Sequence, residues 1–440
     1  MKVSFTSLGC AKNLIDSEQM IALITAAGHE LVSDPAEADA AVVNTCAFID
    51  AAQQEAIDAI LELAAYKTEG SLRRLVVTGC LPQRYEGEIL KELPEIDAVL
   101  GTGSFADIVE ALESDERHFA RFLDKNAPLP ELDRVVTTGP AWAYIKVADG
   151  CDNRCAYCVI PSIRGRYRSR PVQTVAEEAR ALAQAGVKEL ILVAQNLTHY
   201  GKDLGDGTTL CTLLRALATI DGIEWIRLHY LYPYEMTDEL IDLIASEPKI
   251  VKYLDLPLQH VNDGILRRMR RPETRARIEA LLDTLRRRID GVVLRTSLIV
   301  GLPGEGETEF RELMDFMRAQ RLPRAGVFVF SPQEGTPAAE MTDRCTTEEA
   351  EKRRDTLMAL QNRIMDEYDR EQIGRVFPVL CEGTDGERYF GRRYADSPEI
   401  DEQVYFTAAA PISPGTFTDV RITGAEDGCL YGEADAFPAP

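Results

Sequence analysis

Short apolar runs alternate with longer amphipathic stretches through the first part of the chain. Residues 3–7, 40–44 and 74–78 are short segments of strand type, and the last two are mostly apolar, which is typical of buried strands in a parallel sheet. Residues 13–27 and 51–66, which lie between these runs, carry apolar side chains at helical spacing. The order β-α-β-α-β predicts an open parallel α/β domain at the N-terminus.

The same alternation continues over residues 139–337, where a strand pattern followed by a helix pattern occurs six times. The expected strands cover residues 141–147, 189–194, 225–228, 253–256, 292–300 and 327–330. One helix is expected to open with a capping box from Thr174 to Glu177, and another to follow residues 272–274. Six β/α units predict a partial (β/α)6 barrel with its chemistry at the carboxyl ends of the strands.

A different pattern ends the chain. Residues 346–373 predict a charged helix, and residues 374–440 contain short strands separated by Gly and Pro, as in a small β-barrel. We therefore expect an α/β protein of three domains. They are an N-terminal domain over residues 1–125, the partial barrel over residues 137–372, and the C-terminal β domain.

Each of the three N-terminal strand patterns runs directly into a cysteine, namely Cys10, Cys46 and Cys80. Because the carboxyl ends of parallel strands lie along one edge of a sheet, these thiols are expected to meet. Any single one could be an ordinary buried cysteine, but three at equivalent positions favour a shared site. We predict an iron–sulfur cluster held by three cysteines, with one iron left open.

A second group of thiols lies on one short segment. Cys151, Cys155 and Cys158 have the spacing C-x3-C-x2-C, one ligand short of closing a cubane cluster. An iron with an open position can bind a small molecule and pass it an electron. Zinc is the main alternative, but structural zinc takes four ligands, commonly as two C-x2-C pairs, and no second pair is present.

Composition narrows the class of protein further. The chain has 440 residues, 10 cysteines and a formal net charge of −23. The low cysteine content argues against a secreted disulfide framework, and the negative charge argues against general affinity for nucleic acid. No apolar run approaches the length of a membrane span, so we expect a cytoplasmic protein. The remaining cysteines are interpreted as structural: Cys211, Cys345, Cys381 and Cys429.

Together these features resemble the methylthiotransferase family of radical S-adenosylmethionine (SAM) enzymes over the whole chain. Within that family, residues 160–171 and 255–263 resemble the branch that modifies a ribosomal protein. The resemblance implies transfer of a methylthio group to the β-carbon of one aspartate in small-subunit ribosomal protein S12.

The resemblance also implies two [4Fe–4S] clusters and SAM as cofactors. The cluster on Cys151, Cys155 and Cys158 would bind SAM and, once reduced, yield a 5′-deoxyadenosyl radical that removes the substrate hydrogen. The N-terminal cluster would hold the sulfur, and a second SAM would supply the methyl group. A sulfur donor and an electron donor are therefore expected partners, besides the protein substrate.

Five further residues are implied as cofactor contacts. Tyr157 is the aromatic residue before the last cysteine of the loop. Gln195 and Asn196 end the second barrel strand, where related enzymes bind the methionine amine of SAM. Gly301 and Pro303 lie in the turn where relatives contact the adenine. A solvated strand end and an ordinary turn are the respective structural alternatives.

Two other features stay open at this stage. Four alternating arginines, Arg164, Arg166, Arg168 and Arg170, either contact the methionine carboxylate or the substrate, or form a solvated basic loop. His260 follows the fourth barrel strand. A hydrogen-bonded structural histidine is favoured there over a proton donor or a ligand.

The C-terminal segment resembles the TRAM module, which binds RNA in tRNA-modifying relatives. Residues 376–440 contain 12 Asp and Glu against 4 Arg. Phosphate binding relies on Lys and Arg, so direct RNA binding is not expected. Acidic positions such as Asp401 and Glu402 instead favour a basic protein partner. An acidic face kept for solubility is the alternative.

Two other functions fit parts of the pattern. A tRNA adenosine methylthiotransferase would use the same cofactors, but the acidic C-terminal segment and the sequence of residues 257–260 disfavour it. A non-catalytic iron–sulfur electron carrier would be smaller, with clusters closed by four ligands.

Overall fold

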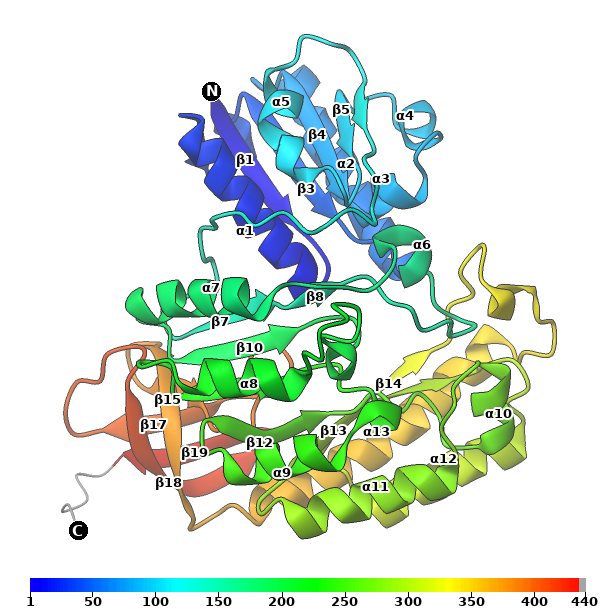
Figure 1. Cartoon of the computed structure of the whole chain (residues 1–440), viewed down its shortest axis with the longest axis vertical. Coiled ribbons are helices and arrows are strands. Elements are labelled where there is room, and N and C mark those ends of the chain that lie inside the picture. The colour runs from blue at the N-terminus through cyan, green and yellow to red at the C-terminus, as the bar shows by residue number, and fades with distance from the viewer. Residues whose placement is uncertain (435–440) are drawn as a thin grey trace.

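The computed structural model describes residues 1–434, which form three packed parts (Figure 1). The N-terminal part is a six-stranded parallel sheet in the order β2-β1-β3-β4-β5-β6. Its strands are β1 (Lys2–Ser7), β2 (Glu30–Val32), β3 (Ala40–Thr45), β4 (Arg74–Gly79), β5 (Ala98–Leu100) and β6 (Phe119–Arg121). Its helices are α1 (Ala11–Ala26), α2 (Asp50–Glu69), α3 (Cys80–Arg84), α4 (Ile89–Glu92) and α5 (Ile108–Glu113). The three predicted strands and two predicted helices are confirmed. Strands of three residues, such as β2, are too short for their pattern to predict them.

The second part is an open, curved sheet of six parallel strands in the order β14-β13-β12-β11-β10-β7, so the predicted partial barrel is confirmed. Its strands are β7 (Trp142–Lys146), β10 (Glu189–Val193), β11 (Trp225–Leu228), β12 (Ile250–Asp255), β13 (Val293–Val300) and β14 (Arg324–Val329). Its helices are α6 (Ile160–Arg164), α7 (Val172–Gln184), α8 (Leu210–Ala218), α9 (Asp238–Ser246), α10 (Asp263–Arg268), α11 (Arg275–Arg288) and α12 (Glu307–Gln320). A small antiparallel pair, β8 (Ala148–Asp149) and β9 (Arg168–Ser169), follows β7.

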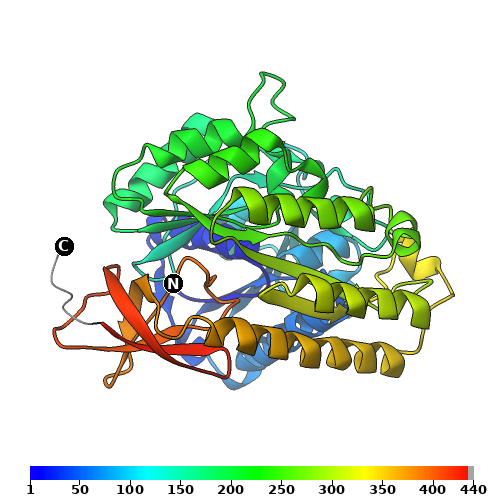
Figure 2. The same ribbon diagram turned by 90° about the horizontal axis from the view of Figure 1, so that it is seen from below.

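The two faces of this half barrel are buried against different neighbours. Helices cover the outer face, where alternate strand residues such as Ile145 and Leu192 join the main apolar core (Figure 2). The intervening residues, such as Tyr144 and Ile191, form a second cluster on the inner face together with Leu380 of the C-terminal module. Since strand side chains alternate between faces, near-continuous apolar strands are what such a doubly covered sheet requires.

Two predicted helix starts have different outcomes. Thr274 caps α11 as expected, because its hydroxyl accepts a hydrogen bond from the Arg277 N–H at 3.4 Å. The predicted capping box at Thr174 is wrong. Helix α7 already begins at Val172, directly after Pro171, and no side chain caps it. Pro171 at the N-cap position has a fixed φ near −57°, from which the chain enters the helix three residues before the expected start.

The third part is the long helix α13 (Thr347–Arg370) followed by a closed five-stranded barrel, as predicted. The barrel consists of β15 (Val376–Thr384), β16 (Tyr389–Arg392), β17 (Val404–Ala408), β18 (Phe417–Glu426) and β19 (Cys429–Ala434). In Figure 2 it lies against the open side of the half barrel. The last six residues of the predicted β domain lie outside the described residues.

Buried ion pairs join this module to the half barrel. Glu189 of β10 forms ion pairs with Arg227 through one carboxylate oxygen and with Arg392 through the other, both at 2.6 Å. All three side chains are buried. Asp401 is also part of this junction. Its carboxylate accepts hydrogen bonds from Tyr253 at 2.7 Å and from the backbone of Ser397, and its side chain is only 6% exposed. The expectation that Asp401 is a surface docking residue is therefore wrong.

The helices of the described chain are too short or too polar for a lipid bilayer. Within residues 1–434, none is both long and apolar enough to cross a membrane.

Candidate active site

Cys10, Cys46 and Cys80, which we call the strand-end group, follow three neighbouring strands of the N-terminal sheet. Cys10 caps α1 after β1, Cys46 follows β3, and Cys80 begins α3 after β4. The close approach of the first two depends on Gly9, which has a φ of +92°. A Cβ at this position would lie 2.7 Å from the Cβ of Cys46. The predicted convergence of these chain segments therefore occurs at one sheet edge.

The three thiols of the strand-end group differ in their surroundings. Cys10 is exposed, Cys46 half-buried and Cys80 buried. Desolvation by the surrounding protein atoms disfavours the Cys10 thiolate. The charges of Lys12 and Arg164 and the helix N–H groups have the larger effect, so the pKa of Cys10 is lowered. Burial raises the pKa of Cys46, and it raises that of Cys80 to about 12 despite the nearby Arg164. Cys10 is thus the thiol most ready to ionise.

Cys151, Cys155 and Cys158, which we call the loop group, lie between β8 and α6. Backbone hydrogen bonds fix the loop. The Cys158 N–H donates to Cys155 O and the Cys151 N–H to Gly165 O beyond α6, both at 3.1 Å, and the Ala156 N–H donates to Met269 O at 3.0 Å. Burial raises the pKa of Cys151 to about 11 and that of Cys158 to about 12. Both thiols are therefore protonated at neutral pH unless a metal displaces the proton.

The donor chemistry of both groups fits an iron–sulfur cluster, since each consists of sulfur ligands alone. Within residues 1–434, no three His, Cys, Asp or Glu side chains are already close enough to hold a metal ion. The thiols of each group nevertheless lie near enough to affect one another's ionisation. A cluster bound by either group would draw its thiols together and displace their protons.

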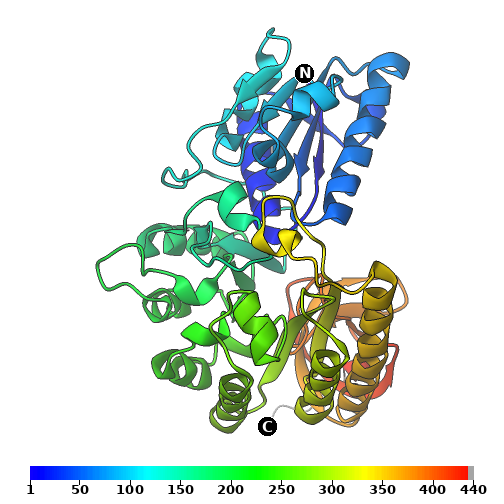
Figure 3. The same ribbon diagram turned by 90° about the vertical axis from the view of Figure 1, so that its right-hand side faces the viewer.

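Arg164 links the two groups across the domain junction. Its Nη2 lies 3.6 Å from Cys80 Sγ, and its Nη1 donates to Asp149 at 3.0 Å and to Asp16 at 2.7 Å. Asp149 lies two residues before the loop group, and Lys146 also contacts Asp16. Although burial opposes ionisation, Arg164 and Lys146 hold the pKa of Asp149 well below its usual range. Figure 1 shows α6 below α3, where the N-terminal sheet meets the half barrel, and Figure 3 shows the same junction from the side.

The four alternating arginines do not form a solvated basic loop. Arg164 and Arg170 are buried, the latter between Glu131 at 2.5 Å and Glu178 at 2.6 Å. Arg168 donates to the backbone of Ala127 and Arg164, and only Arg166 is exposed. The regular spacing of these arginines does not predict which of them are buried, because their carboxylate partners lie on other segments, as with Glu131 and Glu178 for Arg170.

The polar pair after β10 borders the loop group. Gln195 Nε2 donates to Asp149 Oδ1 at 2.7 Å, while Gln195 Oε1 is buried and has no hydrogen-bond partner among residues 1–434. A buried acceptor without a donor fits a ligand that carries an amine. Asn196 is already satisfied, since it donates to Glu235 and accepts from Thr198.

The other predicted contacts have structural neighbours of their own. Tyr157 is half-buried, and its burial raises its pKa although Arg271 is close. Gly301 has a φ of +76°, and a Cβ there would lie 2.8 Å from Ala350 Cβ in α13. Helix packing therefore explains this glycine. Pro303, two residues on, is buried in the same turn.

His260 is a buried structural histidine, as favoured from the sequence. Its Nδ1 accepts from the Asn262 N–H at 3.0 Å, and its Nε2 lies 3.4 Å from Glu305. Glu305 is in turn bound by Arg353 of α13 at 2.8 Å. These contacts tie the strand ends to α13, although His260 Nε2 forms no hydrogen bond among residues 1–434.

Sequence reasoning missed Lys12, Asp16, Lys146 and Asp149. Lys12 could have been noticed, because it follows Cys10 by two residues. It is 6% exposed, and its Nζ lies 3.8 Å from the ring centroid of Tyr230, just after β11. The other three became visible only when distant segments were brought together.

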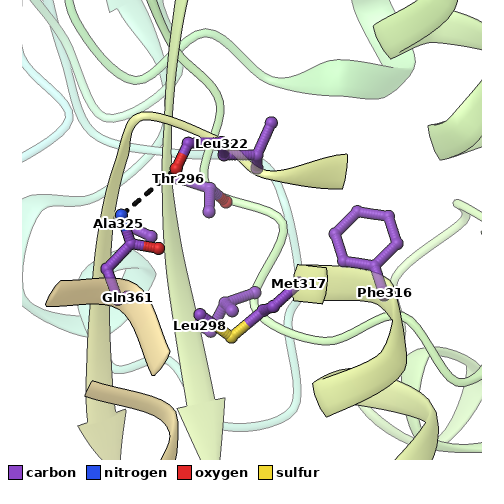
Figure 4. Close-up of a pocket in the computed structure, with 7 residues that line it drawn as sticks. All are labelled: Thr296, Leu298, Phe316, Met317, Leu322, Ala325 and Gln361. Carbon is purple, nitrogen blue, oxygen red and sulfur yellow. Dashed lines mark hydrogen bonds between the residues drawn. The ribbon is translucent and has the colours of Figure 1, made fainter. Parts of the chain in front are cut away.

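Two hollows in the described part of the chain lie away from the cysteines. One is a cavity of about 10 Å³ behind β13, room for about one water molecule. Figure 4 shows its apolar lining and the hydrogen bond from Gln361 to Leu322 O at 3.1 Å. The other is an open groove near Trp225 and Phe417, at the opposite end of the barrel strands. Neither belongs to the candidate site.

Three family models match the chain in succession. They are Uncharacterized protein family UPF0004 over residues 2–101, the Radical SAM superfamily over residues 145–317, and the TRAM domain over residues 373–434. The half barrel with its three-cysteine loop therefore defines a radical SAM enzyme, a class that uses SAM and an iron–sulfur cluster.

Relatives define the family more closely. A protein of Pelobacter propionicus is 47% identical over 98% of this chain and 97% of its own length. One of Lachnoclostridium phytofermentans is 46% identical over 99% of this chain and 100% of its own length. Both are named "Ribosomal protein uS12 methylthiotransferase RimO". The chain belongs to this RimO family of radical SAM methylthiotransferases.

Solved structures support the fold. The radical SAM methyltransferase TsrM of Kitasatospora setae matches with a TM-score of 0.56 at 17% identity, over 77% of this chain and 76% of its own. The cobalamin-dependent radical enzyme OxsB matches with a TM-score of 0.52 at 13% identity, over 77% of this chain and 54% of its own.

Proposed function

We propose that this chain transfers a methylthio group to the β-carbon of an aspartate in ribosomal protein uS12. The name shared by its relatives supports this substrate. The observation that carries the proposal is the placement of two three-cysteine groups on either side of one junction, joined by Arg164. The β C–H bond of aspartate is unactivated, so no side chain can remove its hydrogen as a base, and radical chemistry is needed.

Each cysteine group would hold one [4Fe–4S] cluster, the strand-end group through Cys10, Cys46 and Cys80 and the loop group through its own three thiols. When bound, the clusters and SAM supply the radical and the methylthio group. The chain itself contributes the ligands and holds the two sites at a fixed separation through the buried ion pairs of Arg164. An electron donor and a sulfur donor complete the reaction as partners.

Residues around the loop group would position SAM. Gln195 Oε1 is a buried free acceptor and suits the methionine amine. Asn196 helps indirectly, by fixing Glu235 and the strand end. Tyr157 would border the cluster, and the turn of Gly301 and Pro303 would lie on the adenine side. These assignments require the cofactor to sit over the carboxyl ends of the strands, as in other half barrels of this kind.

The C-terminal module would contact the protein substrate rather than RNA. Two of its four arginines, Arg392 and Arg393, are buried and therefore not available to phosphates. The exposed acidic residues of the described module are Asp385, Glu387, Glu399, Glu402, Asp419, Glu426, Asp427 and Glu433. An acidic face suits a basic ribosomal protein, and such a substrate implies a cytoplasmic enzyme. We also propose that the chain divides into three domains, residues 1–125, 137–372 and 374–440, in line with the three successive family matches.

Mass spectrometry of uS12 tests the proposal directly. Cells with the gene should carry the methylthio group on one aspartate of uS12, and cells without it should not. Nucleosides of tRNA from both strains should be identical. Unmodified uS12 in both strains, with a methylthio adenosine lost from tRNA, would instead establish the tRNA alternative.

A further inference from the structure

A buried lysine between the two cysteine groups has no carboxylate partner. Lys12 lies in the first turn of α1 and is 6% exposed. Its Nζ contacts the ring of Tyr230 at 3.8 Å from the centroid. Across residues 1–434, no side-chain hydrogen bond or ion pair of Lys12 is formed. A cation–π contact with one ring compensates only part of the cost of burying a charge.

The carboxylates buried around this lysine are fewer than the cations. Three cations, Lys12, Lys146 and Arg164, face two carboxylates, Asp16 and Asp149. Asp16 is shared by Lys146 and Arg164, and Asp149 is held by Arg164 at 3.0 Å. The cation left over is Lys12. An unpaired buried charge is costly, and such groups concentrate where a ligand completes the pairing.

Lys12 lies between the strand-end group and the carboxyl ends of the barrel strands, where a substrate would have to bind. It follows Cys10 of the strand-end group by two residues, and it touches Tyr230 at the carboxyl end of β11. Tyr230 itself has a φ of +70°, held by a hydrogen bond from its N–H to Asp255. Strained backbone of this kind persists where the surrounding structure fixes it, commonly at functional sites.

We propose that Lys12, packed on Tyr230, binds the side-chain carboxylate of the substrate aspartate. This inference rests on the proposed function and names its recognition element. The β-carbon is bonded directly to that carboxyl group, so pairing with Lys12 would hold the reacting carbon beside the cysteines of the strand-end group. A site with a buried cation also rejects a neutral analogue, which would leave the cation unpaired.

Lys12 also stabilises the thiolate of Cys10, so its replacement would affect both cluster binding and substrate binding. A double-mutant cycle separates the two roles. Wild-type protein and Lys12→Met, both with reconstituted clusters and SAM, are titrated against dye-labelled uS12 that carries either Asp or Asn at the modified position. Fluorescence anisotropy gives the four dissociation constants.

Lys12→Met should weaken binding of the Asp form about tenfold to hundredfold and that of the Asn form by less than about threefold, as for a close charge pair. Equal losses for both forms would overturn the assignment and leave Lys12 as a neighbour of the cluster. Wild-type protein that never modifies uS12 would overturn the proposed function instead.

Lys146→Met is the matched control, because this lysine is equally buried in the same junction but paired with Asp16. Its effect should be the same for both substrate forms. If Lys12→Met loses iron, Lys12→Arg keeps the measurement decisive: it retains the charge and should retain the preference for Asp over Asn. Loss of that preference in Lys12→Arg with full iron content would count against the assignment.

Discussion

The loop group and the strand-end group place the same three donor atoms in different settings. The loop group lies on one short segment, and Arg271, which packs 4.2 Å from the centroid of the Tyr232 ring, is among its charged neighbours. The strand-end group is assembled from three strands, and Lys12 and Arg164 lie beside it. The first site is therefore locally encoded, whereas the second depends on the fold and on the domain junction.

The loop group is expected to be the source of all SAM cleavage. Replacing Cys151, Cys155 and Cys158 together with Ala should abolish 5′-deoxyadenosine formation and about halve the iron content, because one of two four-iron sites is lost. Chromatography of the reaction products and an iron assay measure both effects. Unchanged iron in this variant would show that the metal is held elsewhere.

The strand-end group is expected to affect product formation alone. With Ala at Cys10, Cys46 and Cys80, methylthio product should disappear while some 5′-deoxyadenosine is still formed, since the loop group lies in a different domain. The comparison with the previous variant separates the two roles. Loss of both activities in a well-folded protein would contradict this division.

The dependence of the strand-end group on the junction can be tested at Arg164. Arg164→Met would leave Asp16 and Asp149 short of a buried partner, so the free energy of unfolding should fall by about 3–5 kcal/mol. Urea titration measures this change. Arg166→Met is the control, because Arg166 is exposed on the same segment and should matter by less than about 0.5 kcal/mol. Equal effects of the two substitutions would mean that Arg164 does not hold the junction.

The smallest effect is expected at the acidic face of the C-terminal module. Replacing Glu387, Asp419 and Glu426 with Lys should slow association with uS12 several-fold at low salt, and less at high salt, because exposed charges are screened over about 8–10 Å. SAM cleavage without substrate should be unaffected. Faster association with tRNA together with higher activity would favour the RNA alternative.

The sequence predicts the architecture and both cysteine groups because their signals are local or periodic. Two of the three strands that precede a cysteine, β3 and β4, are clear apolar runs, and C-x3-C-x2-C is a contiguous motif. The functional surroundings could not be predicted in the same way. Asp16 and Arg164 are 148 residues apart, and nothing local marks them as partners. Asp401 shows the same limit, since it looks like an ordinary surface acid until Tyr253 is placed beside it.

The central claim is that the two cysteine groups act on the same atom, the β-carbon of the substrate aspartate. Deuterium transfer tests this claim most directly. The reconstituted protein is given SAM and uS12 that carries deuterium at the β-carbon of its aspartates, and both products are quantified by mass spectrometry. The account predicts deuterium in 5′-deoxyadenosine and a methylthio group on a single aspartate, both dependent on the loop group. Methylthio product without deuterium transfer, or deuterium transfer in full with no modified aspartate, would contradict it.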